Sequence, residues 1–101
     1  MIVYVDLDNT LCVTKGTDYE NSKPIINRIE YINKYFDQGH KITIYTARGS
    51  LTKINHYELT RNQLKSWGVK YHNLIVGEKP VYDLLIDDKA KSDIEFFKSI
   101  D

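Results

Sequence analysis

The feature that most constrains the fold is the regular alternation of short strand-like segments with longer helix-like ones. Apolar runs rich in β-branched or aromatic residues predict strands over residues 2–5, 41–45, 74–76 and 82–86. Between and after these runs, apolar residues recur every three or four positions, which predicts helices over residues 24–38, 52–67 and 91–100. Strands separated by helices form a parallel sheet with helices packed against it. We therefore predict an α/β, Rossmann-like fold of about four parallel strands with helices on both faces.

Local signals refine this prediction. Residues 2–5 are continuously apolar, which is typical of a strand buried on both faces. Pro24 suits the first turn of a helix, with Ser22 as the candidate N-cap. Gly39 and Gly68 are expected to end the first and second helices.

The inward faces of these helices are predicted from the spacing of their apolar residues. These residues are Ile25, Ile29, Ile32 and Phe36 in the first helix, Ile54, Tyr57, Leu64 and Trp67 in the second, and Ile94, Phe97 and Ile100 in the last.

Composition excludes several classes of protein. With 101 residues the chain is expected to form one domain over residues 1–101. Its 14 basic and 14 acidic side chains balance, so it lacks the basic surface that nucleic-acid partners require. The single cysteine, Cys12, excludes an intramolecular disulfide and a cysteine-rich zinc site. The first apolar run is too short for a signal peptide or a membrane span, so we expect a cytoplasmic protein without a membrane partner.

Polar side chains stand where each predicted strand ends. They are Asp6 and Asp8, then Thr46 and Arg48, then Lys79, and finally Asp87 and Asp88. The carboxyl ends of parallel strands meet at one edge of the sheet, where ligands bind. Carboxylates gathered there repel one another unless a cation compensates them. Mg²⁺ is favoured because it accepts few carboxylates together with waters and phosphate oxygens.

These residues resemble the four motifs of the haloacid dehalogenase (HAD) superfamily, in its phosphatase branch. The resemblance rests on Asp6-Leu7-Asp8-Asn9-Thr10, on Thr46, on Lys79-Pro80 and on Asp87-Asp88, in this order along the chain. It implies a HAD-type phosphatase domain that hydrolyses phosphomonoesters with Mg²⁺ through an aspartyl-phosphate intermediate. The intervals between the motifs are too short for a cap domain, so the chain resembles a capless member.

The resemblance also implies a role for each matching residue. Asp6 would be the nucleophile, and Asp8 would be the general acid and then the general base. Thr46 and Lys79 would hold the phosphoryl group, and Asn9, Thr10 and Arg48 would face the substrate. The implied magnesium ligands are the Asp6 side chain, the Asp8 main-chain carbonyl and the Asp87 side chain. Asp88 would support the metal shell or Lys79.

Several interpretations stay open at this stage. Arg48 could bind a second anionic group of the substrate or pair with a surface carboxylate. Thr46 could instead cap the second helix, and Asp87-Asp88 could cap the last one. Lys79 could lie in an ordinary solvated turn. Cys12 is expected to be a small buried residue, and the three histidines are expected to be structural or solvated.

The expected substrate is a small phosphorylated metabolite, with a sugar phosphate of surface-polysaccharide biosynthesis as the first analogy. Without a cap the site would be open, so a large substrate or a second subunit would cover it, and a homo-oligomer is one expectation. The alternatives are a receiver-like phosphoacceptor module and a catalytically silent HAD-like scaffold that binds a partner.

Overall fold

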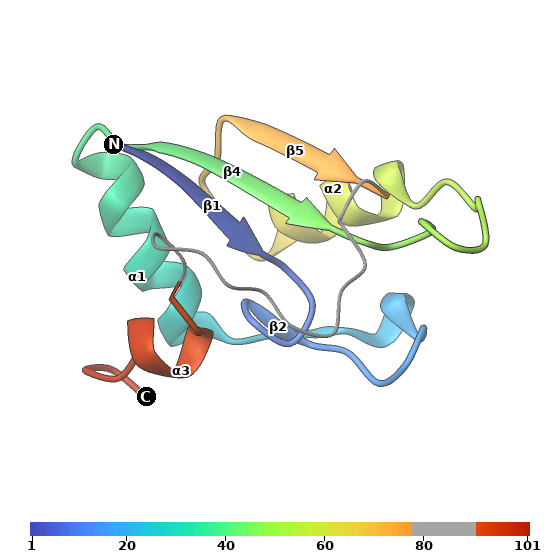
Figure 1. Cartoon of the computed structure of the whole chain (residues 1–101), viewed down its shortest axis with the longest axis horizontal. Coiled ribbons are helices and arrows are strands. Elements are labelled where there is room, and N and C mark those ends of the chain that lie inside the picture. Colours follow the sequence, from blue (N-terminus) through green and yellow to red (C-terminus); the bar gives the residue numbers. More distant parts are fainter. Residues whose placement is uncertain (78–90) are drawn as a thin grey trace.

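The computed structural model describes residues 1–77 and 91–101 of the chain (Figure 1). The strands are β1 (Ile2–Asp6), β2 (Cys12–Val13), β3 (Lys23–Pro24), β4 (Lys41–Thr46) and β5 (Asn73–Val76). The helices are α1 (Ile26–Asp37), α2 (Tyr57–Ser66) and α3 (Asp93–Phe96), with a short 3-10 turn at Tyr19–Asn21. Among the described helices, none is both long and apolar enough to cross a membrane.

The central sheet is parallel, with the strand order β1-β4-β5. Val5 pairs with Ile44 across β1 and β4, and Tyr45 pairs with Ile75 across β4 and β5. From β1 to β4 and from β4 to β5 the chain steps to the next strand on the same side. Because such crossovers are right-handed, α1 and α2 lie on the same face of the sheet. The described residues thus confirm a small α/β fold with three parallel strands and no inserted cap. The expected fourth strand, residues 82–86, lies outside the described residues.

The core lies between one face of this sheet and the helices. Val5, Ile42 and Ile44 point to this face, because paired residues of parallel strands share a face. They join a buried cluster that includes Ile29 from α1 and Leu64 from α2. Each of these side chains is at most 6% exposed, so this face carries the apolar burial that stabilises the fold.

The prediction that residues 2–5 are buried on both faces is wrong. Ile2 is 71% exposed and Tyr4 is 62% exposed, while Val5 is buried. The reason lies in the topology, since α1 and α2 both cover the Val5 side of the sheet. The expectation of helices on both faces is therefore not met within the described part of the chain.

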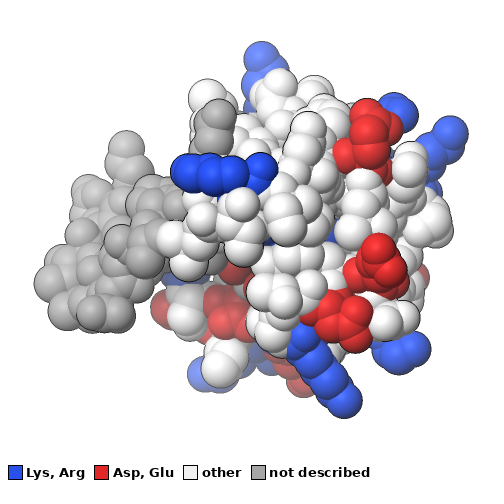
Figure 2. Space-filling view, turned by 90° about the vertical axis from the view of Figure 1, so that its right-hand side faces the viewer, with Lys and Arg blue, Asp and Glu red and all other residues white. Residues whose placement is uncertain are grey.

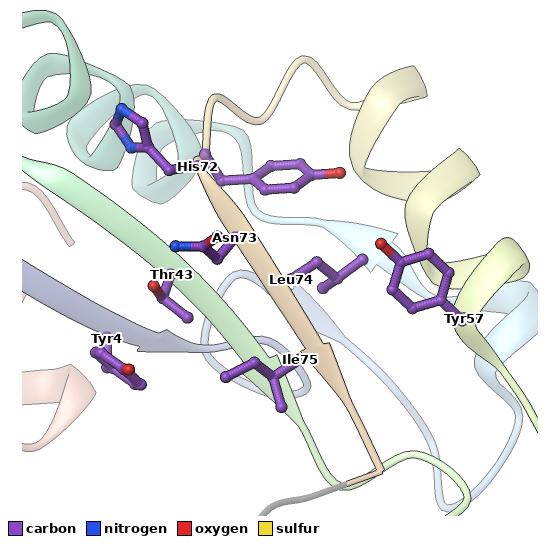
Figure 3. A pocket seen from close by; sticks show the side chains of 8 residues that line it. Tyr4, Thr43, Tyr57, His72, Asn73, Leu74 and Ile75 are labelled. Carbon is purple, nitrogen blue, oxygen red and sulfur yellow. The ribbon is translucent and has the colours of Figure 1, made fainter.

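A shallow hollow of about 420 Å³ lies around β5 and is lined from both sides of this strand (Figure 3). Tyr4, Thr43 and Ile75 approach it from the three strands, and Tyr57 reaches it from α2. The side chains that line it include none of the predicted site residues. The hollow is thus separate from the strand ends where the site was expected.

The first helix begins later than predicted. Lys23 and Pro24 are extended and pair with β2, and the backbone N–H of Ile25 donates to the carbonyl of Leu11 at 2.9 Å. The helix N-cap is Ile25, whose side chain makes no capping hydrogen bond. Ser22 is therefore not the cap. α1 ends at Asp37, two residues before Gly39, which adopts a φ of +92°.

The second helix is shorter than the predicted span of 52–67. α2 begins at Tyr57, and the Asn55 side chain accepts a hydrogen bond from its N–H at 2.9 Å. The preceding residues form turns, in which Lys53 has a φ of +61° and donates to the Gly49 carbonyl. Ile54 is 59% exposed rather than on an inward face. Gly68 follows the end of the helix as predicted.

The last helix is also shorter than predicted. α3 covers only Asp93–Phe96, and the Ser92 hydroxyl caps it by accepting from the N–H of Glu95 at 3.1 Å. Phe97 is buried as predicted, whereas Ile94 is 72% exposed. The rings of Phe96 and Phe97 pack edge-on against Tyr31 of α1, so aromatic contacts hold this segment against the first helix.

Candidate active site

The loop after β1 is held in a tight turn. The Leu7 carbonyl accepts hydrogen bonds from the N–H groups of Thr10, Leu11 and Cys12, at 2.9 to 3.3 Å. Asn9 adopts a left-handed backbone conformation with a φ of +61°, and its side-chain oxygen accepts from the N–H of Thr14 at 3.1 Å. These contacts fix the backbone that carries the two aspartates.

The carboxyl ends of β1 and β4 meet at Asp8 and Thr46. The Thr46 hydroxyl donates to Asp8 Oδ2 at 2.9 Å, and the Thr46 side chain is almost fully buried. Asp8 and Thr46 are thus in direct contact, although they are 38 positions apart in the sequence. Thr46 does not cap a helix, because α2 begins at Tyr57.

Three further side chains surround the Asp8 carboxylate. Thr14 donates its hydroxyl to Oδ1 at 2.7 Å. Arg48 donates from Nη2 to Oδ1 at 2.8 Å and from Nε to Oδ2 at 3.0 Å. The Cys12 thiol lies 3.7 Å from Oδ1. Arg48 therefore holds both carboxylate oxygens in the bidentate geometry that the planar guanidinium favours.

The Arg48 side chain is fully buried, with 0% of it exposed. It pairs with a carboxylate of the candidate site rather than with one on the open surface. A buried arginine is costly unless its charge is paired and its N–H groups are satisfied. Both conditions hold here, so Arg48 is a built-in part of the site and not an adaptable surface group.

A second set of contacts satisfies the rest of the Arg48 guanidinium. Nη1 donates to Thr60 Oγ1 at 3.2 Å and to Gln63 Oε1 at 2.5 Å, both on α2. The guanidinium also lies over the Tyr19 ring, 4.7 Å from its centroid. Gln63 in turn donates to the Tyr19 carbonyl at 2.6 Å. This network joins β4, α2 and the loop after β1 around Asp8.

Sequence reasoning did not find Thr14, Tyr19, Thr60 and Gln63. The spacing of Thr60 and Gln63 by three residues places them on one helical face, which is the only sequence signal they carry. Nothing in the sequence indicates that this face points to Arg48. The partners of a buried arginine depend on the tertiary fold.

The surroundings of Asp8 determine its protonation. Burial alone would raise its pKa, but hydrogen bonds from Arg48 and Thr14, the positive charge of Arg48 and the Thr46 hydrogen bond together hold the pKa below the ordinary value of 3.8. Asp8 is therefore ionised at neutral pH. In this state it can accept a proton, as a general base must.

Asp6 lies at the end of β1 and is half-buried. The Thr10 hydroxyl donates to Asp6 Oδ2 at 3.3 Å. The Thr10 carbonyl in turn accepts from Nη1 of Arg28 at 3.1 Å, which ties this loop to α1. The side chain of Asn9 supports the loop through Thr14, as described above, so Asn9 and Thr10 both order the turn next to Asp6.

Cys12 is buried, as the sequence analysis expected, and two of the histidines make structural contacts. Cys12 is completely buried, and burial raises the pKa of its thiol, which therefore stays protonated. His72 Nδ1 accepts from the N–H of Ile42 at 3.1 Å, and its ring stacks on Phe36. His40 lies 2.9 Å from the N-terminal amino group.

Lys79, Asp87 and Asp88 lie outside the described residues, so their expected roles stay predictions. Within residues 1–77 and 91–101, no three histidine, cysteine, aspartate or glutamate side chains gather in a way that could hold a metal ion. The two implied ligands that are described, the Asp6 carboxylate and the Asp8 main-chain carbonyl, offer hard oxygen donors. This donor chemistry fits Mg²⁺.

An open cleft of about 450 Å³ borders the same end of the sheet. Its walls include Arg48, Lys53 and His56 on one side and Val76 and Gly77 at the end of β5. Figure 2 views the molecule from the side toward which the strands point, and it shows acidic and basic side chains interspersed there. Among the described residues that the sequence analysis assigned to the site, Arg48 lines this cleft, whereas Asp6, Asp8 and Thr46 do not.

Comparison with known proteins identifies one informative relative. A crystal structure of a target protein from Vibrio cholerae superimposes with a TM-score of 0.82 and is 31% identical in sequence. The match covers 94% of this chain and 85% of the Vibrio cholerae chain. No protein family model and no curated protein matches the chain.

Proposed function

We propose that this chain, which belongs to the same family as the Vibrio cholerae protein, is a Mg²⁺-dependent phosphomonoester hydrolase of the HAD superfamily. The observation that carries the proposal is the meeting of Asp8 and Thr46 at the carboxyl ends of two parallel strands, with Asp6 two residues before Asp8. Burying polar and charged side chains around a carboxylate costs desolvation free energy. A catalytic role for that carboxylate would explain why the chain keeps such a network at this edge of the sheet.

The reaction assigned to these residues has two steps. An Asp6 carboxylate oxygen attacks phosphorus, and the bond from phosphorus to the ester oxygen breaks, so that the oxygen departs with the electron pair and takes a proton from Asp8. Water then attacks the phosphorus of the aspartyl-phosphate and gives a proton to Asp8. Phosphate leaves, and the Asp6 carboxylate is restored.

The other residues stabilise the transferring group. On binding of substrate, Thr46 would turn its hydroxyl proton from Asp8 to a phosphoryl oxygen, and Lys79 is proposed to contribute positive charge. Mg²⁺, held by Asp6, the Asp8 carbonyl and Asp87, would supply charge neutralisation at the phosphoryl group. The second step needs an ionised Asp8 as the base, and this is the state that the surrounding hydrogen bonds favour. The first step needs a protonated Asp8 as the acid, and pairing with Arg48 disfavours that state.

The proposed substrate is a small phosphorylated metabolite, and a sugar phosphate is the first choice. The support is the open cleft beside Arg48 and Gly49, which can accept the rest of such a molecule. The proposed location is the cytoplasm, where phosphorylated metabolites are found.

The experiment is a phosphate-release assay on a panel of sugar phosphates, nucleotides and small acid phosphates, with Mg²⁺ and then with EDTA. We expect release that requires Mg²⁺ and disappears in Asp6→Asn. The control variant is Asp37→Asn, which removes an exposed carboxylate paired with Lys70 and should keep full activity. Magnesium binding without release of phosphate from any ester would favour a receiver-like module or a silent scaffold.

A further inference from the structure

Arg48 combines three features that do not occur together at any other arginine among the described residues. Its side chain is completely buried, it contacts both oxygens of Asp8, and it is anchored on α2 by Thr60 and Gln63. Arg28 is also buried, but its carboxylate partners, Asp93 and Asp101, lie on the C-terminal segment. The candidate site thus has its own dedicated arginine.

The contacts on Asp8 fix the plane of its carboxylate. A single hydrogen bond would allow the carboxylate to rotate about its Cβ–Cγ bond, but the bidentate guanidinium restrains both oxygens at once. Thr14 on Oδ1 and Thr46 on Oδ2 reinforce the same orientation, at 2.7 and 2.9 Å. The orientation of Asp8 is therefore set by Thr46 and Arg48 from the end of β4 together with Thr14 from its own loop.

The far side of Arg48 explains why the guanidinium itself does not move. Gln63 accepts from Nη1 and at the same time donates to the Tyr19 carbonyl, and the Tyr19 ring covers the guanidinium. Thr60 is fully buried, so its hydroxyl is held in place as well. Through Arg48, α2 supports a carboxylate that lies beyond the end of β1.

We propose that Arg48 is the positioning residue for Asp8, and that it acts through Asp8 on the hydrolysis of the aspartyl-phosphate. This inference rests on the proposed function. The hydrolysis step needs Asp8 within reach of the attacking water, and small displacements of a general base reduce a rate by about 10²-fold. Arg48 does not touch the reacting atoms, so its effect must pass through the Asp8 carboxylate.

The test uses p-nitrophenyl phosphate, because its leaving group departs without a proton. Formation of the aspartyl-phosphate should then stay fast in Arg48→Lys, while its hydrolysis slows. We expect a burst of p-nitrophenolate close to one equivalent per active site, followed by a steady state about 10²-fold slower than wild type. Arg48→Lys keeps the charge and loses the bidentate geometry. Arg48→Gln serves as the second variant if Arg48→Lys fails to fold.

The burst amplitude gives the concentration of active sites. Dividing the steady-state rate by this amplitude corrects for any loss of folded protein. If Arg48 were merely structural, the steady-state rate per active site would equal that of wild type, and the proposal would be overturned. Arg61→Lys is the control, because it changes an arginine whose partner, Glu58, is exposed and lies outside the candidate site. It should show wild-type turnover per folded molecule.

A double-mutant cycle tests whether Arg48 acts through Asp8. In an Asp8→Asn background, replacing Arg48 by Lys should change the steady-state rate by less than about twofold. An additive, roughly 10²-fold further loss would contradict the proposal. If wild type itself releases no p-nitrophenolate from this ester, the proposed function is wrong. If wild type turns over and Arg48→Lys turns over equally fast, only the positioning role of Arg48 is wrong.

Discussion

Asp8 is the residue on which the candidate site depends most. Four hydrogen-bonding side chains converge on it, two from the loop region after β1 and two from the carboxyl end of β4 and the turn after it. One of the four, Arg48, is in turn held by α2. The identity of Asp6, Asp8 and Thr46 as site candidates could be predicted from the sequence, because strand ends of a parallel sheet share one edge. The pairing of Arg48 with Asp8 could not, since it requires knowing which face of α2 points inward.

The pKa of Asp8 is the first prediction at this scale. Because the folded-state pKa lies below 3.8, the ionised carboxylate contributes stability above about pH 3.8 that is lost as the pH falls through the folded-state value. Titration of the Asp8 carboxyl carbon by NMR should give a midpoint below 3.8. A midpoint for Asp8 above 4 would contradict the described network.

At the scale of elements, the sequence predicted the strands better than the helices. β1, β4 and β5 match the predicted runs to within one residue at each end, because their apolar β-branched patterns leave little choice. The start of α2 was missed because the turn at Gly49 and the Asn55 side chain compete with helix formation, and neither effect is visible in hydrophobic periodicity.

The turn after Arg48 gives an element-scale prediction. Gly49 has a φ of +82°, and a Cβ placed there would overlap the carbonyl oxygen of Ile54. Gly39 also has a positive φ, of +92°, but a Cβ there would meet open space. Gly39→Ala should therefore cost about 1–2 kcal/mol of unfolding free energy from backbone strain alone.

Gly49→Ala should cost roughly 1–3 kcal/mol more, because the loop must also shift. Urea denaturation of both variants against wild type measures the difference. Equal losses in the two variants would show that the turn from Gly49 to Ile54 is not packed as described.

At the scale of the whole molecule, the C-terminal segment is tied to α1 and to the loop after β1. Arg28 of α1 bonds Asp93 of α3 at 2.9 Å, the C-terminal Asp101, and the Thr10 carbonyl in the loop after Asp8. Its guanidinium also lies over the Phe97 ring, 4.6 Å from the centroid. The overall class of fold was predictable from the strand–helix alternation, whereas this contact joins residues 73 positions apart and leaves no sequence pattern.

Loss of this arginine should loosen the C-terminal segment. Arg28→Gln should speed amide hydrogen exchange within residues 93–101 and lower the urea midpoint. Arg61→Gln, which breaks an exposed pair with Glu58, should change stability by less than about 0.5 kcal/mol. Arg28 also lowers the pKa of Asp101, so the difference between wild type and Arg28→Gln should shrink below about pH 3.8. Unchanged exchange near the C-terminus would contradict this description.

The central claim is that Asp6 carries a phosphoryl group during turnover. The most direct measurement is to quench the enzyme with acid during hydrolysis of an ester labelled in its phosphoryl group, and to locate the label on the protein by peptide mass spectrometry. We predict label on the peptide that contains Asp6, and none in Asp6→Asn. Turnover without protein-bound label, or label on another residue, would contradict the account.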